Sequence, residues 1–250
     1  MKQMDQELQI TRVDNAQLSH KTRDALIAII KENARDGKPF KLPNEDLLSQ
    51  RLGVSRNVLR DALMSLEEMG IVTRRRSKGT IANPMIANIT GRQDINPELF
   101  HMLQEMGYTP RVETKRLGFI YENDPAFGSE NSYLNVEKLF LADEKPVAYC
   151  VDHIAGSFSG RGKEFISLLK DCSHYKFLDR YCQTTMAYTM ARVDVLLAEP
   201  WLTHILKINE NEPVILMEDH GYNFDHEIVV HSYIYFRRDT ISIRFLRKNW

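Results

Sequence analysis

Cysteine is scarce in this chain, and its spacing shows no paired pattern. The 250 residues include three cysteines, Cys150, Cys172 and Cys182. An odd number of cysteines without an apolar leader segment fits a reducing compartment, where buried thiols act as small apolar groups. We therefore expect a cytoplasmic protein.

Long apolar runs and metal-binding motifs are also missing. No apolar run approaches the ~20 residues that a membrane span needs, and the amino terminus lacks the apolar core of a signal peptide. The eight histidines include no His-x-x-x-His pair, and no Cys-x-x-Cys occurs. We expect a soluble protein with no membrane partner, no metal site and no cofactor.

The net charge of −1 is unevenly distributed along the chain. Residues 1–83 contain 15 Lys and Arg against 11 Asp and Glu, whereas the rest contains 18 against 23. The positive excess therefore lies in the amino-terminal part, where it would favour contact with nucleic acid.

Residues 42–66 predict two short helices joined by a tight turn. Asn44 is a suitable N-cap for the first helix, Gly53 permits the turn, and Ser55 can cap the second helix. Apolar residues at helical spacing predict the buried face of the second helix. They are Val58, Leu59, Ala62, Leu63 and Leu66.

The opposite face of the second predicted helix carries Arg56, Asn57 and Arg60, with the two arginines one turn apart. A helix that is supported by a neighbour and presents arginines and an amide outward can enter the major groove of DNA. Ser55, at the start of this helix, completes the predicted contact set.

Residues 71–82 predict a two-stranded hairpin directly after the helices. Its turn carries four predicted DNA contacts, Arg75, Arg76, Lys78 and Gly79. Basic side chains at such a tip can contact phosphate or lie in the minor groove, and a glycine allows close backbone approach. A solvated surface hairpin is the alternative, but the order of helix, turn, helix and hairpin favours double-stranded DNA.

Together these segments resemble the winged-helix domain of GntR-type bacterial transcription regulators. The resemblance rests on Leu42–Leu63, Leu66–Val72 and Lys78–Thr80. The family commonly has Ser-Glu-Arg where this chain has Asn44-Glu45-Asp46. An acid thus replaces an arginine that is often available to DNA, which argues against a phosphate contact from this position.

The sequence predicts an α+β protein in two parts. We assign residues 1–83 to the winged domain, 84–96 to a linker and 97–250 to a mixed α/β domain with an antiparallel sheet. The predicted strands are extended apolar or β-branched segments. They are 112–121, 133–141, 147–154, 184–197, 214–222, 228–236 and 241–246.

Segments of the second part resemble the UTRA effector domain of the HutC branch of GntR regulators, whose fold is similar to chorismate lyase. They are Leu139–Ala148, Leu206–Val214 and Tyr235–Asp239. The resemblance implies a transcription regulator, a repressor in our interpretation, that responds to a small-molecule effector. It also implies a homodimer formed through the effector domains, which would bind a pseudo-palindromic operator.

The resemblance further implies where an effector would bind. In sugar-phosphate-sensing relatives two arginines grip the phosphate, and Lys138 and Phe140 stand at the matching positions here. Without an arginine fork, phosphate recognition is disfavoured. We expect a less polar effector, such as a monocarboxylate anchored by Lys138, although the same residues could simply fill a core. The predicted lining is Phe140, Cys150, Val230, Ser232, Ile234 and Phe236.

Two other functions compete with a regulator. An enzyme could act on a small organic acid through the domain similar to chorismate lyase, with Asp152, His153, His220 and His231 as an acid–base cluster. Strand histidines are more often structural, and neither a nucleophile elbow nor a phosphate loop accompanies them, so we predict no catalytic residues. An architectural DNA binder would leave the strand-rich domain unexplained.

Overall fold

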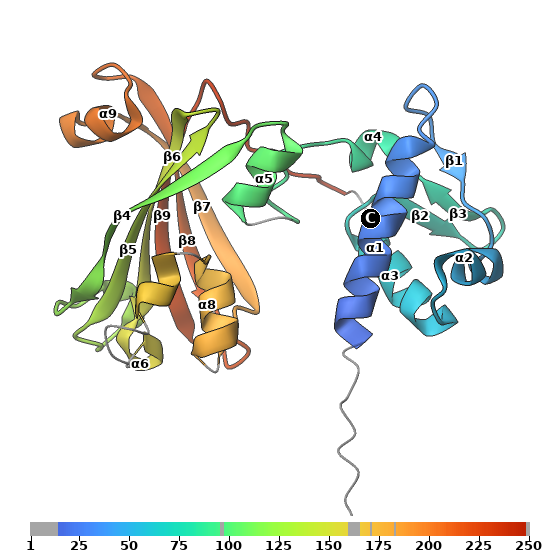
Figure 1. The fold of residues 1–250 in the computed structure, drawn as a ribbon, viewed down its shortest axis with the longest axis horizontal. Coiled ribbons are helices and arrows are strands. Elements are labelled where there is room, and N and C mark those ends of the chain that lie inside the picture. Colours follow the sequence, from blue (N-terminus) through green and yellow to red (C-terminus); the bar gives the residue numbers. More distant parts are fainter. Residues whose placement is uncertain (1–14, 96–97, 160–165, 171, 183, 249–250) are drawn as a thin grey trace, which may run out of the picture. The chain divides into compact units, whose positions relative to one another are not determined.

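The structure, a computed structural model, describes residues 15–95, 98–159, 166–170, 172–182 and 184–248 (Figure 1). The chain forms two compact units. The first runs to Thr90 and includes the segment from Phe245 on, and the second runs from Gly91 to Arg244. Within the described ranges, no helix combines the length and apolarity that a membrane crossing requires.

Helices and a three-stranded sheet build the first unit. Its elements are α1 (Asn15–Glu32), β1 (Phe40–Lys41), α2 (Glu45–Leu52), α3 (Arg56–Glu68), β2 (Val72–Arg75), β3 (Gly79–Ala82) and α4 (Pro84–Ala87). The Asn44 side chain accepts a hydrogen bond from the Leu47 N–H (2.9 Å), which caps α2. Gly53 adopts a left-handed φ of +66°, so the chain turns sharply before α3.

The core of the first unit lies between α1 and α3. All five residues predicted for the buried face of α3 are buried, which confirms that prediction. Four of them, Leu59, Ala62, Leu63 and Leu66, pack with Leu26 and Ile30 of α1, and Ala87 of α4 joins the same core. The segment predicted as a linker therefore begins as part of this unit. β1, which pairs with β3, is too short to show a periodicity in the sequence.

A six-stranded antiparallel sheet, ordered β4-β5-β6-β9-β8-β7, forms the centre of the second unit. Its strands are β4 (Pro110–Ile120), β5 (Tyr133–Ala142), β6 (Lys145–Ala155), β7 (Tyr188–Leu197), β8 (Pro213–Tyr222) and β9 (Ile228–Arg237). The helical elements are α5 (Leu99–Glu105), η1 (Pro125–Phe127), α6 (Gly156–Ser159), η2 (Leu168–Lys170), α8 (His174–Tyr181) and α9 (Pro200–Leu206).

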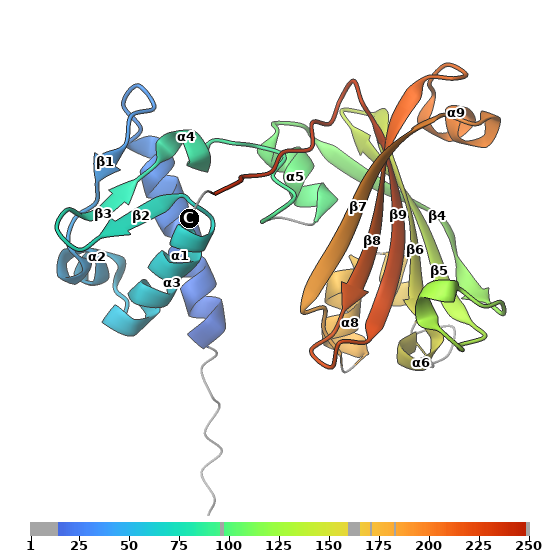
Figure 2. The same ribbon diagram turned by 180° about the vertical axis from the view of Figure 1, so that it is seen from behind.

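The two faces of this sheet have different covers. Helix α8 lies in front of the strands in Figure 1 and behind them in Figure 2. Phe177 of α8 packs on Val136 and Val230, which defines the α8 face of the sheet. Leu202 of α9 packs with Tyr149 on the opposite face, which we call the α9 face.

Two strand predictions for this unit need correction. Residues 241–246 add no strand to the sheet, because Arg244 forms an isolated parallel bridge with Arg92 and the chain then returns to the first unit. Strand β7 begins at Tyr188, later than the predicted start at 184. The predicted boundary between 96 and 97 lies outside the described residues.

Candidate functional site

Helix α3 presents Arg56, Asn57 and Arg60 on its exposed face. Its cap is Ser55, whose hydroxyl accepts a hydrogen bond from the Val58 N–H (3.3 Å). This cap fixes where α3 begins, and because the hydroxyl oxygen only accepts in it, the O–H of the exposed Ser55 can still donate to a phosphate.

Acids at the start of α2 hold both arginines of α3. Arg56 Nε lies 2.9 Å from Asp46 Oδ1, and Arg60 Nε donates to Glu45 Oε2 (2.7 Å). Arg74 of β2 pairs with the other oxygen of Glu45 (2.9 Å), and the hydrogen bond from Arg60 lowers the pKa of Glu45. The sequence shows Asp46 as a departure from the family pattern, but its pairing with Arg56 depends on the packing of α2 against α3.

Replacing Asp46 by alanine is expected to strengthen binding to all DNA sequences about equally, by roughly 2–5-fold. The change removes a negative charge beside the phosphates and an exposed ion pair worth ~0–1 kcal/mol. Fluorescence anisotropy with random-sequence duplex would measure the gain, with Asp179→Ala, an exposed acid of the second unit, as control. Unchanged affinity would show that Asp46 lies away from the DNA.

The hairpin of β2 and β3 carries the predicted phosphate contacts at its tip. Arg75 pairs in register with Gly79, and residues 75–79 are exposed. Gly79 has a φ of +84°, a conformation that favours glycine. Arg76 and Lys78 lie in the turn between the two strands.

Replacing Arg75, Arg76 and Lys78 by glutamine is expected to weaken binding to all sequences alike. The slope of log affinity against log salt should become shallower by about 0.9 for each phosphate that the protein no longer neutralises. Titrations between low and moderate salt would measure it. The matched control replaces three exposed basic residues of the second unit, Arg180, Lys207 and Arg238, and an equal slope change there would exclude a role for the hairpin.

A cavity of about 540 Å³ lies on the α8 face of the second unit. Strands β4, β5, β6 and β9, helices α5 and α8, and the segment around η2 contribute to its lining. The volume suits a small molecule. Four lysines and arginines line the cavity with two acids. They are Arg111, Lys138, Lys170 and Lys176, with Glu98 and Asp152. Arg111 also pairs with Glu113 and Glu144, and Lys176 pairs with Glu98.

The residues predicted for the effector pocket divide into two groups. Lys138, Phe140, Cys150 and Ile234 line the cavity. The other three, Val230, Ser232 and Phe236, lie on the same α8 face of the sheet but do not line the cavity. The α8 residue Phe177 packs on Val230, helix α5 covers Phe236 through Leu99 and Met102, and Ser232 donates to Asp152 Oδ1 (2.6 Å).

The Lys138 ammonium is buried and already engaged. Its Nζ donates to the carbonyl oxygens of Leu169 (2.7 Å) and Cys172 (2.6 Å), which ties the segment before α8 to β5. Asp152, two register positions away on β6, lies 3.1 Å from His174 Nδ1. Burial opposes the charge of Asp152, but His174 and the Ser232 hydroxyl hold its pKa below the usual value. The cavity lining thus contains one buried cation and one buried anion.

Asp219 of β8 is half-buried and in register with Ser232, and its buried Oδ1 has no hydrogen-bond partner among the described residues. Burial, with Asp152 nearby, raises its pKa from 3.8 to about 6, although His174 works in the opposite direction. Ionised Asp219 therefore destabilises the fold. Protonated Asp219 does not destabilise the folded state in this way. Its contribution to the free energy of unfolding is therefore fully present below pH 3.8 and is lost as the pH rises through about 6.

Asp219→Asn is expected to raise the free energy of unfolding by about 1–2 kcal/mol at pH 7.5. This gain is smaller than the free-energy difference that the pKa shift of Asp219 implies, because the amide N–H groups need new acceptors. The gain should vanish near pH 4. Urea denaturation of variant and parent at both pH values would measure it, and a gain that does not depend on pH would contradict the assignment.

The two units together define a DNA-binding protein with a small-molecule site. A capped helix with exposed arginines beside a basic hairpin binds DNA, and a domain with a small-molecule cavity follows in the same chain.

The comparisons agree with this class. The family of bacterial regulatory proteins called gntR matches residues 28–81, and the UTRA domain matches residues 126–242. YydK from Bacillus subtilis subsp. subtilis str. 168, described as a possible transcriptional regulator, is similar in structure with a TM-score of 0.73 and 13% identity, over 92% of this chain and 99% of that chain. PhnF from Mycobacterium smegmatis gives 0.56 and 18%, over 91% and 99%. At these identities the structural likeness shows the fold alone, and no curated protein matches.

The chain belongs to the GntR family of bacterial transcription regulators, in its HutC subfamily. The winged helix-turn-helix unit binds DNA, and the UTRA unit is a ligand-binding effector domain. Because the family consists of regulators, the alternative of an enzyme is set aside.

Proposed function

We propose that the protein is a homodimeric repressor whose operator affinity falls when a small organic acid binds in the cavity. The observation that carries the effector class is a cavity lined by one buried ammonium, Lys138, with Phe140 at the matching second position. One ammonium can meet one carboxylate oxygen, whereas a phosphate is best held by a bidentate arginine fork.

The exposed edge of β7 supports a homodimer. This strand pairs with β8 on one side, and at the other side it is the last strand of the sheet among the described residues. Met190, Val195 and Leu197 are 61%, 64% and 60% exposed. An apolar edge strand that is left open favours pairing with another chain. A second copy is the partner that would also supply the second DNA-binding unit for a two-fold operator.

The test uses an operator selected from random duplex DNA by the purified protein. Mobility shift with a panel of small organic acids and with glucosamine-6-phosphate should show release by one of the acids and none by the sugar phosphate. Sedimentation equilibrium should give a dimer. Release by the sugar phosphate would refute the proposed effector class, and a monomeric DNA-bound protein would refute the dimer.

A further inference from the structure

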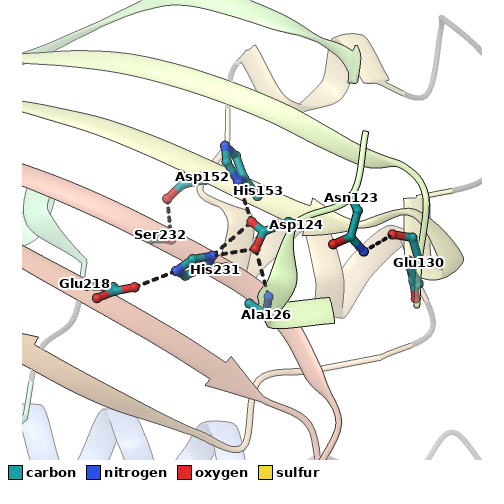
Figure 3. Close-up of polar contacts among 9 residues, drawn as sticks. All are labelled: Asn123, Asp124, Ala126, Glu130, Asp152, His153, Glu218, His231 and Ser232. Atoms are coloured by element: carbon teal, nitrogen blue, oxygen red, sulfur yellow. Dashed lines mark hydrogen bonds and ion pairs between the residues drawn. The ribbon is translucent and has the colours of Figure 1, made fainter. Parts of the chain in front are cut away.

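A cluster of histidines and acids lies on the α9 face of the sheet, apart from the effector cavity. Its centre is the buried Asp124, at the start of η1. His153 Nδ1 lies 2.7 Å from Asp124 Oδ2, and His231 Nδ1 lies 2.9 Å from the same oxygen (Figure 3). His153 and His231 stand directly opposite each other on β6 and β9. Two imidazoles and one carboxylate therefore converge on one point.

The second nitrogen of His231 has its own carboxylate. Its Nε2 lies 3.0 Å from Glu218 Oε1, and Arg192 pairs with Glu218 at 2.6 Å (the contact between His231 and Glu218 is drawn in Figure 3).

Two carboxylates, which can only accept hydrogen bonds when they carry no proton, thus face the two nitrogens of one imidazole, Asp124 at Nδ1 and Glu218 at Nε2. A proton on Nε2 satisfies Glu218. The lone pair of Nδ1 would then face the Asp124 carboxylate, and this contact is favourable only if a cation lies between them, either a second proton or a metal ion. A carboxylate on the far nitrogen is the usual outer partner of a metal-bound histidine, because it fixes the tautomer and the ring orientation.

We propose that Asp124, His153 and His231 bind a divalent first-row transition metal ion, with Glu218 as the outer partner of His231. The three ligand groups lie within 4.8 Å of one another. In a tetrahedral zinc site, bonds of about 2.0–2.1 Å separate the ligand atoms by roughly 3.4 Å. The contacts of 2.7 and 2.9 Å between Asp124 and the two histidines would therefore open by roughly 0.5–0.7 Å when the ion binds. Imidazole with carboxylate suits zinc, iron or nickel rather than magnesium or calcium.

A second combination, Glu218, His220 and His231, is geometrically less suitable. The rings of His220 and His231 are stacked, with centroids 4.6 Å apart and planes 13° apart. Stacked rings direct their nitrogen lone pairs along parallel planes, whereas the rings of His153 and His231 are inclined at 86° and can aim at a common point. This difference assigns the site to Asp124 and His153.

The metal ion on the α9 face would be connected to the effector cavity on the α8 face through strands β6 and β9. Asp152 and Ser232, the neighbours of His153 and His231 along β6 and β9, point to the α8 face and hydrogen bond with each other beside the cavity. Consecutive strand residues alternate between faces. An ion on the α9 face therefore fixes the two strands that carry Asp152 and Ser232, and it ties the β4–β5 connection to them.

Calorimetric titration of the full chain with ZnCl2, without an affinity tag and after dialysis against EDTA, tests the proposal. The parent should bind one zinc ion per chain. Asp124→Asn keeps the acceptor for the Ala126 N–H (2.9 Å) but removes the charge, and it should lose more than 100-fold in affinity, as should His153→Ala. Glu218→Gln should lose about 10–100-fold, as expected for an outer partner.

Two histidine controls complete the set. His204→Ala on α9 and His220→Ala should bind zinc as the parent does. Failure of the parent to bind stoichiometrically, binding that survives Asp124→Asn and His153→Ala, or loss in His220→Ala would overturn the assignment. Circular dichroism in EDTA checks that the variants fold. The absorption spectrum of the Co2+-loaded parent tests the ligand set without any variant. A spectrum typical of nitrogen and oxygen ligands supports the site, and a charge-transfer band from a thiolate ligand overturns it.

Discussion

Replacing Arg56 by alanine is expected to weaken operator binding by about 1–3 kcal/mol, roughly 5–150-fold, and to relax the preference at one base position. Arg56 is exposed at the start of α3, and the exposed carboxylate of Asp46 holds its guanidinium (2.9 Å). An exposed ion pair is worth little, so its loss alone cannot account for an effect of this size. A loss of this size would therefore indicate that Arg56 contacts DNA.

Footprinting or mobility shift with the selected operator and with its single-base variants would measure both consequences. Arg180→Ala, an exposed arginine of α8 in the second unit, is the matched control and should bind as the parent does. An Arg56→Ala protein with full affinity and full base preference would exclude α3 as the helix that enters the groove.

Replacing Lys138 by methionine is expected to abolish release from DNA by the effector while DNA affinity stays unchanged. The methionine would leave the acid of the effector unpaired against apolar walls, at a cost of several kcal/mol in a closed site. The carbonyls of Leu169 and Cys172 would also lose their donor. The segment that leads into α8 would then be released from β5.

Lys170→Met separates the loss of a particular ammonium from a general loss of positive charge. Lys170 lines the same cavity but is exposed, and its replacement should leave the response nearly intact. Calorimetry with the responsive acid and with glucosamine-6-phosphate would measure binding to each protein. Tight binding of the sugar phosphate by the parent, or full acid binding by Lys138→Met, would contradict the role given to Lys138.

The winged unit could be predicted in detail because its determinants are local. The caps Asn44 and Ser55, the left-handed Gly53 and the spacing of the buried α3 residues all act within a few positions along the chain. The alternation of apolar residues also revealed most strands of the sheet. It failed at 241–246, where Ile241 packs in the core without belonging to a strand.

The sites could be predicted less well, because they depend on contacts between distant segments. Alternation places Val230 and Phe236 on the cavity face, but only the packing of α8 and α5 shows that they are covered. Asp124 and His231 are 107 residues apart in the chain. The sequence suggests that His153 and His231 could meet on neighbouring strands, but spacing along the chain does not reveal Asp124, the carboxylate between them.

The chain passes between the two units twice, once after Thr90 and again after Arg244. The returning segment belongs to the first unit, where Leu246 packs at Gly70 and Lys248 Nζ donates to the Glu67 carbonyl (2.6 Å). An exchange of DNA-binding units between related regulators would therefore need two splice points. A chimera that replaces residues 1–90 alone would place a foreign tail against its new helices, and its specificity could change with a segment at the far end of the gene.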